Sequence, residues 1–148
     1  MSISKFRLLT LALVVGCAAP PVATTVSAQT YQCATATNDE ASGLQTYIAS
    51  VVAGSDSASI QDRAQYQLPV TTASKVVFLT RASDCRTAAQ HFYTALGTTP
   101  PTSGTIVVIA LKVASNRYVV TVVGVNVGEF TPALTFDSKW KLLANVVG

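Results

Sequence analysis

Two apolar runs separated by a short polar pair dominate the second half of the chain. They lie within TIVVIALKVASNRYVVTVVG, residues 105–124, and the polar pair is Ser115 and Asn116. A polar pair between two runs rich in β-branched residues is typical of the two-residue turn of a β-hairpin. The pattern therefore predicts two antiparallel strands around which the rest of the chain folds.

Pairing outward from this turn decides which side chains of the hairpin share a face, because side chains alternate along a strand. The pairs expected on the core face are Val113 with Tyr118, Leu111 with Val120, and Ile109 with Val122. A slip of one residue would turn Lys112 and Arg117 toward the core, so we expect a firm register.

The opposite face of the hairpin combines Lys112 and Thr121 with several apolar side chains. These are Ile106, Val108, Val119 and Val123. A soluble domain seldom leaves a wide apolar patch in water. Two interpretations follow. Either a further helix covers this face and makes the fold three-layered, or a protein partner or a second copy of the chain binds there.

Two helices are expected after an extended polar segment at 29–36. Thr37 or Asn38 can cap the first, which has Asp39 and Glu40 in its first turn, ends at Gly54 and carries an apolar stripe at helical spacing. Its stripe comprises Leu44, Tyr47, Ile48, Val51 and Val52. The second is capped by residues 55–57 and runs to about residue 66, with Ile60 and Ala64 inward. Residues 70–74 are expected to form a loop.

A short strand and a third helix are expected between residues 75 and 97. The run KVVFLT, residues 75–80, shows little alternation, which indicates a strand that is central or buried on both faces. Ser83 and Asp84 would cap the helix, and Gly97 would end it. Its apolar face carries Cys85, Ala88, Ala89, Phe92, Ala95 and Leu96.

Two more strands are expected at about 133–137 and 140–146, after a glycine-containing bend at 124–130. The resulting order is α-α-β-α-β-β-β-β. It predicts an α+β fold in which three helices pack on an antiparallel sheet of about five strands. The length suits one small domain, residues 29–148.

Residues 1–28 have the pattern of a secretory signal peptide. Lys5 and Arg7 supply the positive charge, and Leu8–Ala19 is an apolar run too short to cross a bilayer. Small residues at the end of the segment predict cleavage between Ala28 and Gln29. The mature protein is then secreted or periplasmic.

A second route of export is open, because VVGC, residues 14–17, resembles a bacterial lipobox. In that case Cys17 would be lipidated and the protein would be a membrane-anchored lipoprotein. After removal of residues 1–28, eight cations (10 − 2) oppose seven acids, leaving a net charge of about +1. Without a Lys/Arg cluster, nucleic acid is not an indicated partner, and no later apolar run predicts a transmembrane helix.

Two cysteines, Cys33 and Cys85, follow the signal segment. An even number of cysteines in an oxidising compartment predicts a disulfide bond. A bond between these two cysteines would restrict the unfolded chain and so stabilise the fold by about 4 kcal/mol in the chain-entropy model.

Residues with catalytic potential are scarce. His91 is the chain's one histidine, and its neighbours in the sequence supply neither a nucleophile nor an orienting carboxylate. We therefore expect it at the border of a helix face rather than in a catalytic role. No catalytic, cofactor-binding or metal-binding motif is found.

These observations favour a small exported bacterial domain that acts as a binding or interaction module rather than an enzyme. An alternative comes from the element order. Two helices, a strand, a helix and a run of antiparallel strands resemble the NTF2-like cone. That resemblance implies a small-molecule pocket used for ligand binding or for catalysis.

Overall fold

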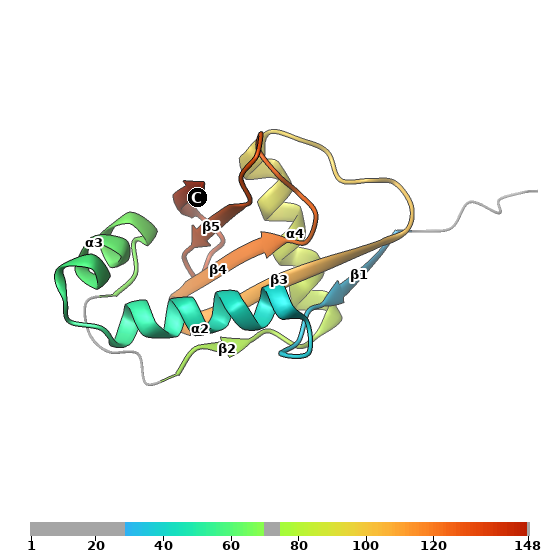
Figure 1. The fold of residues 1–148 in the computed structure, drawn as a ribbon. Helices are drawn as coiled ribbons and strands as arrows, with labels where there is room; N and C mark the ends of the chain where they lie inside the picture. The colour runs from blue at the N-terminus through green and yellow to red at the C-terminus, as the bar shows by residue number, and fades with distance from the viewer. Residues whose placement is uncertain (1–28, 70–74, 148) are drawn as a thin grey trace, which may run out of the picture.

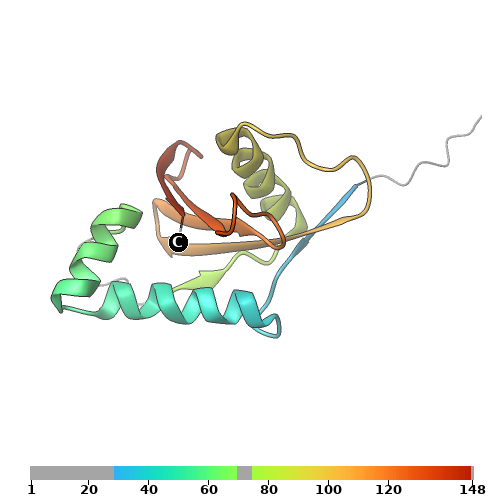
Figure 2. The ribbon, with the colours of Figure 1, turned by 45° about the horizontal axis from the view of Figure 1, so that its top comes forward.

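A mixed six-stranded sheet lies between helices on its two faces (Figures 1 and 2). The computed structural model describes residues 29–69 and 75–147. In chain order the elements are β1 (Thr30–Cys33), α2 (Asp39–Ala53), α3 (Ser57–Tyr66), β2 (Val77–Phe78), α4 (Ala82–Leu96), β3 (Thr105–Ala114), β4 (Arg117–Val122), β5 (Pro132–Phe136) and β6 (Leu142–Val147).

Some expectations concern residues outside the described ranges. They are the signal peptide at 1–28, the cleavage site that follows Ala28, the lipidation site at Cys17 and the loop at 70–74. Within the described ranges, none of the helices is long and apolar enough to cross a membrane.

The α+β class is confirmed, because three helices pack on one sheet. The strand order is β1-β3-β4-β5-β6, and β2 also pairs with β3. The structure adds one strand to the expected set, since β1 runs parallel to the first half of β3. The sheet is therefore mixed rather than purely antiparallel. The sequence TYQC is too short and too polar to predict this strand by itself.

β2 is a two-residue edge strand, not the central or doubly buried strand expected over residues 75–80. Val77 pairs with Lys112 and Phe78 with Leu111, and Val77 is 37% exposed. β1 and β2 bond the same edge of β3, one along each half. The apolar run at 75–80 thus lies at the margin of the sheet.

The central hairpin turns at Ser115 and Asn116, as expected, but a β-bulge shifts its register. The recorded pairs are Ala114 with Arg117, Lys112 with Tyr118, Leu111 with Val119, Ala110 with Val120, Ile109 with Thr121, and Val108 with Val122. Val113 is the extra residue on β3, so the pairs predicted from the sequence for Val113, Leu111 and Ile109 are wrong. One inserted residue exchanges the faces of β4 relative to β3.

Helices cover both faces of the sheet, which makes the fold three-layered (Figure 2). Ile106 and Val108 are buried in the core under α4, whereas Val119 is buried in the core under α2. Val123 is partly buried against that second core. The partner or dimer surface expected from these four residues is therefore not exposed, because the bulge distributes them between two internal cores.

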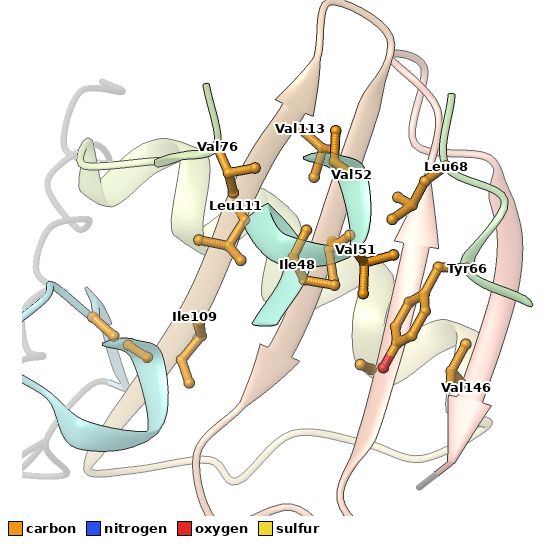
Figure 3. Close-up of a cluster of buried hydrophobic side chains, with 14 residues drawn as sticks. Ile48, Val51, Val52, Tyr66, Leu68, Val76, Ile109, Leu111, Val113 and Val146 are labelled. Atoms are coloured by element: carbon orange, nitrogen blue, oxygen red, sulfur yellow. The ribbon is translucent and has the colours of Figure 1, made fainter. Parts of the chain in front are cut away.

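The core between α2 and the sheet is formed largely by β-branched and leucine side chains. Figure 3 shows Ile48 and Val52 of α2 above Leu111 and Val113 of β3, with Val51 nearby. Since these α2 residues lie in the second half of the helix, that half is anchored to the sheet. At its start, the side chain of Asn38 accepts a hydrogen bond from the N–H of Ala41 at 3.0 Å.

α3 buries a different face from the one expected. Ile60 is 54% exposed and Ala64 is also exposed, whereas Arg63 and Tyr66 are buried. The helix packs against α2 and β6, and its contact face is set by the long side chains at positions 63 and 66. Asp56 caps it by accepting the Ser59 N–H at 2.8 Å, as the sequence indicates.

The disulfide bond between Cys33 and Cys85 joins β1 to α4, with a Cα–Cα distance of 5.5 Å. Arg86 of the same helix lies over the ring of Tyr31, 5.7 Å from its centroid. α4 begins at Ala82 with Arg81 as its N-cap residue, so Ser83 and Asp84 do not cap it. The Asp84 carboxylate instead pairs with Arg81 at 2.9 Å.

Candidate ligand-binding site

An open groove of about 400 Å³ lies between the first half of α2 and the sheet. Its lining residues come from both helices of this layer and from three strands or their ends. They are Glu40, Gly43, Leu44, Tyr47, Tyr66, Ile109, Thr121, Thr131 and Ala133. Volumes of about 300–1,000 Å³ are typical of small-molecule sites.

One face of α2 forms the helical wall of the groove. Glu40, Gly43, Leu44 and Tyr47 follow the i, i+3, i+4, i+7 spacing that places side chains on one side of a helix. The second half of α2 is anchored by its buried residues, so the first half is held as a rigid wall above the groove.

Gly43 widens the groove at its helical wall. A glycine inside a helix is less stable than alanine by about 1 kcal/mol. No positive φ requires it here, and a Cβ at this position would meet no heavy atom within 4 Å. Neither backbone conformation nor close packing explains the residue. Because glycine has no side chain, the groove keeps open space next to Leu44 and Tyr47.

Two tyrosines line the groove side by side. The rings of Tyr47 and Tyr66 meet edge to face, with centroids 6.1 Å apart and planes at 62°. The Tyr47 hydroxyl donates to Asp62 Oδ2 at 2.8 Å. Burial, followed by this hydrogen bond, raises the pKa of Tyr47. Burial also raises the pKa of Tyr66, so both phenols stay neutral at physiological pH.

The sheet side of the groove offers an apolar floor with hydroxyl groups that are already paired. The Thr121 hydroxyl donates to the carbonyl oxygen of Pro132 at 2.7 Å. The Thr131 hydroxyl donates to Asn126 Oδ1 at 2.8 Å. Ile109 and Ala133 supply the apolar surface between them. A ligand would therefore meet mainly carbon atoms on this side.

The loop between β4 and β5 leads in the sequence to the lining residue Thr131. It is closed by two backbone hydrogen bonds between Val127 and Phe130, at 2.7 and 3.1 Å. Both of these side chains are about half exposed, at 47% and 52%. The loop therefore holds two exposed apolar side chains on a backbone fixed by its own hydrogen bonds.

Residues singled out in the sequence lie elsewhere in the fold. His91 is on α4, on the opposite face of the sheet, where it packs against Phe136 and Trp140. Cys33 and Cys85 are bonded to each other. Over residues 29–69 and 75–147, no three His, Cys, Asp or Glu side chains come together to hold a metal ion.

The NTF2-like alternative implies a small-molecule pocket, but the sequence does not predict the position or the lining of this groove. Its one local signal is Gly43 in the middle of an otherwise regular amphipathic helix, next to the stripe residue Leu44. The strand residues that complete it depend on the bulge at Val113, which places Thr121 on the α2 side of the sheet. Comparison with protein-family models, curated proteins and solved structures found no match to this chain.

Proposed function

We propose that this protein binds a small, mostly apolar molecule in the groove between α2 and the sheet. The observation that carries the proposal is the open space maintained by Gly43, at a helix position where alanine would be both accommodated and more stable. A largely apolar concave site with a few fixed polar groups is the usual form of a ligand pocket.

The lining favours binding over catalysis. From the described part of the chain it receives no histidine, cysteine or lysine, and its two threonine hydroxyls donate to protein acceptors. Both tyrosines have raised pKa values, which makes their phenols poor bases at neutral pH. The NTF2-like alternative also implies a small-molecule pocket, and the groove supports that part of the expectation without any shared residue.

A neutral fragment tests the proposal. 4-Phenylbutan-1-ol has about eleven non-hydrogen atoms, and at roughly 0.3–0.5 kcal/mol per atom its Kd should be about 0.1–5 mM. The fragment is titrated into the ¹⁵N-labelled chain and binding is followed by NMR. The amide resonances of Gly43, Thr121 and Ala133 should shift. Gly43→Leu should weaken binding at least five-fold, because its side chain enters the groove.

Thr46→Leu is the matched control. Thr46 lies on the same helix, is exposed and does not line the groove. This variant should bind the fragment like the unmodified chain. Shifts scattered over other surfaces, or equal loss of affinity in both variants, would refute the groove as a binding site.

We also propose export to an oxidising compartment, which the disulfide bond supports. N-terminal sequencing of the protein from its native source tests the route. A start at Gln29 indicates signal-peptide cleavage and a secreted or periplasmic protein. A lipidated Cys17 at the N-terminus indicates a membrane-anchored lipoprotein, and retention of Met1 would contradict both routes.

A further inference from the structure

We infer that the groove selects organic cations with an apolar body, such as aryl-alkyl ammonium compounds. This inference rests on the proposed binding function and names the chemical class of the ligand. It combines three observations: Glu40 and two neutral aromatic rings line the groove, and no cationic side chain lines it among the residues that the structure describes.

Within residues 29–69 and 75–147, Glu40 is the one charged residue that lines the groove. It lies in the first turn of α2 and is exposed, so its carboxylate remains at the mouth of the groove in contact with water. A ligand can therefore bury its apolar body against Leu44 and Ile109 while a cationic head stays at this mouth. An exposed ion pair increases affinity by a factor of up to about five.

The tyrosine pair adds a second preference for positive charge. A cation within about 6 Å of a tyrosine ring face is attracted by the electrons of the ring, which increases affinity about two- to five-fold at exposed sites. Tyr47 is suited to this role, because its hydroxyl donates to Asp62 and places a second carboxylate next to that ring. Its phenol also remains a neutral hydrogen-bond donor.

The size of the groove favours a small ligand over a protein. A stable protein interface removes about 800 Å² from each partner. A groove of about 400 Å³ lined by nine residues holds a compact molecule but provides only part of such an interface. Anionic ligands are disfavoured, because Glu40 would repel them and no cationic lining residue would offset the repulsion.

Two fragments of nearly the same shape provide the test. 4-Phenylbutylamine is protonated at pH 7, whereas 4-phenylbutan-1-ol is neutral. In the ¹⁵N-labelled chain at low salt, both should shift the resonances of Gly43, Thr121 and Ala133. The amine should bind about three- to ten-fold more tightly than the alcohol, and raising the salt concentration should reduce this preference.

Glu40→Gln should remove the ion-pair contribution, reducing the amine's advantage by up to about five-fold to the preference that the tyrosine ring supplies, and leave the affinity for the alcohol unchanged. Asp39→Asn is the matched control, because it removes the same charge from the adjacent exposed position, which does not line the groove. The Asp39→Asn variant should keep at least half of the unmodified chain's preference for the amine over the alcohol.

The outcomes separate the two proposals. Binding of neither fragment at the groove overturns the binding function. Binding of the alcohol as tightly as the amine leaves the binding function in place and overturns cation selection. An equal effect of Glu40→Gln and Asp39→Asn also overturns the inference, because the preference would then come from the general charge of the helix end.

Discussion

His91 and Trp140 stack face to face, with ring centroids 5.5 Å apart and ring planes 4° apart. Tyr118 stacks on Trp140 as well, at 4.7 Å and 10°. The three nearly parallel rings join α4 to β4 and to the turn before β6. The sequence indicates His91 as a border residue of its helix, and its half-buried position in this stack agrees with that expectation.

Trp140 takes a left-handed backbone conformation, with φ at 63°. A residue with a Cβ is less stable there by about 1–2 kcal/mol, whereas glycine adopts the conformation freely. Both Trp140→Ala and Trp140→Gly lose the ring stack. We expect Trp140→Gly to be more stable than Trp140→Ala by about 1 kcal/mol, measured by denaturant unfolding. At positions with ordinary backbone conformation the alanine variant is usually the more stable. If Trp140→Ala were more stable than Trp140→Gly here too, the turn would not hold the left-handed conformation.

The two buried threonines on the α2 face of the sheet make a matched pair. Thr121 donates a hydrogen bond to Pro132, whereas the fully buried hydroxyl of Thr135 has no partner among the described residues. Thr135→Val should therefore stabilise the fold by up to about 1 kcal/mol, and Thr121→Val should destabilise it by about 1–3 kcal/mol. Thermal or denaturant unfolding of the two variants gives the comparison. Equal effects would contradict the different hydrogen bonding of the two side chains.

Gly43 and Gly54 also allow a direct comparison. Gly43→Ala should stabilise the chain by about 0.5–1 kcal/mol, because the new methyl group meets no neighbour and alanine favours the helix. Gly54→Ala should destabilise it, since the Cβ would lie 2.8 Å from Ser59 Cβ and 3.0 Å from the carbonyl oxygen of Ser50. Denaturant unfolding measures both. A destabilised Gly43→Ala variant would mean that the space beside this residue is filled.

Asp137 should make stability depend on pH. Its carboxylate accepts the backbone N–H groups of Lys141 at 2.9 Å and Lys139 at 2.8 Å, and these hydrogen bonds lower its pKa. A lowered pKa in the folded state stabilises the fold above the ordinary carboxyl value of about 3.9. The contribution is lost as the pH falls through the lowered folded value.

Asp137→Ala should therefore reduce the free energy of unfolding at pH 6, and its difference from the unmodified chain should shrink toward pH 2. Ser138→Ala, in the same turn, is the control and should show no such convergence. Denaturant unfolding at a series of pH values measures both variants. A constant difference for Asp137→Ala across this range would refute the role of the ionised carboxylate.

The sequence predicts elements that have strong local signals. It does not predict features that depend on contacts between distant parts of the chain. The Asn38 and Asp56 caps, the anchored stripe of α2 and the turn at 115–116 all depend on residues a few positions apart. The bulge at Val113 does not, because it decides whether Val119 or Val120 faces α2, and that choice depends on how helices pack on both faces of the sheet. Likewise, β1 is a strand because β3 pairs with it.

The buried face of α3 and the groove also depend on tertiary contacts rather than on local sequence signals. Hydrophobicity favours Ile60 as the inward residue, but α3 buries Arg63 and Tyr66 instead, and Tyr66 shares a core cluster with Val146 of β6. The groove needs residues from α2, α3 and the sheet to meet, and no single stretch encodes this meeting. Gly43 was the available local signal, and its meaning depends on what lies opposite.

The bond between Cys33 and Cys85 also has a mechanical consequence. It closes a loop over a sequence separation of 52, which contains α2, α3 and β2. A pulling force applied between the two ends of the chain would pass from β1 through the sulfur atoms into α4 and bypass this loop. The helical wall of the groove, from Glu40 to Tyr66, would then carry no tension even while the strands on either side were loaded.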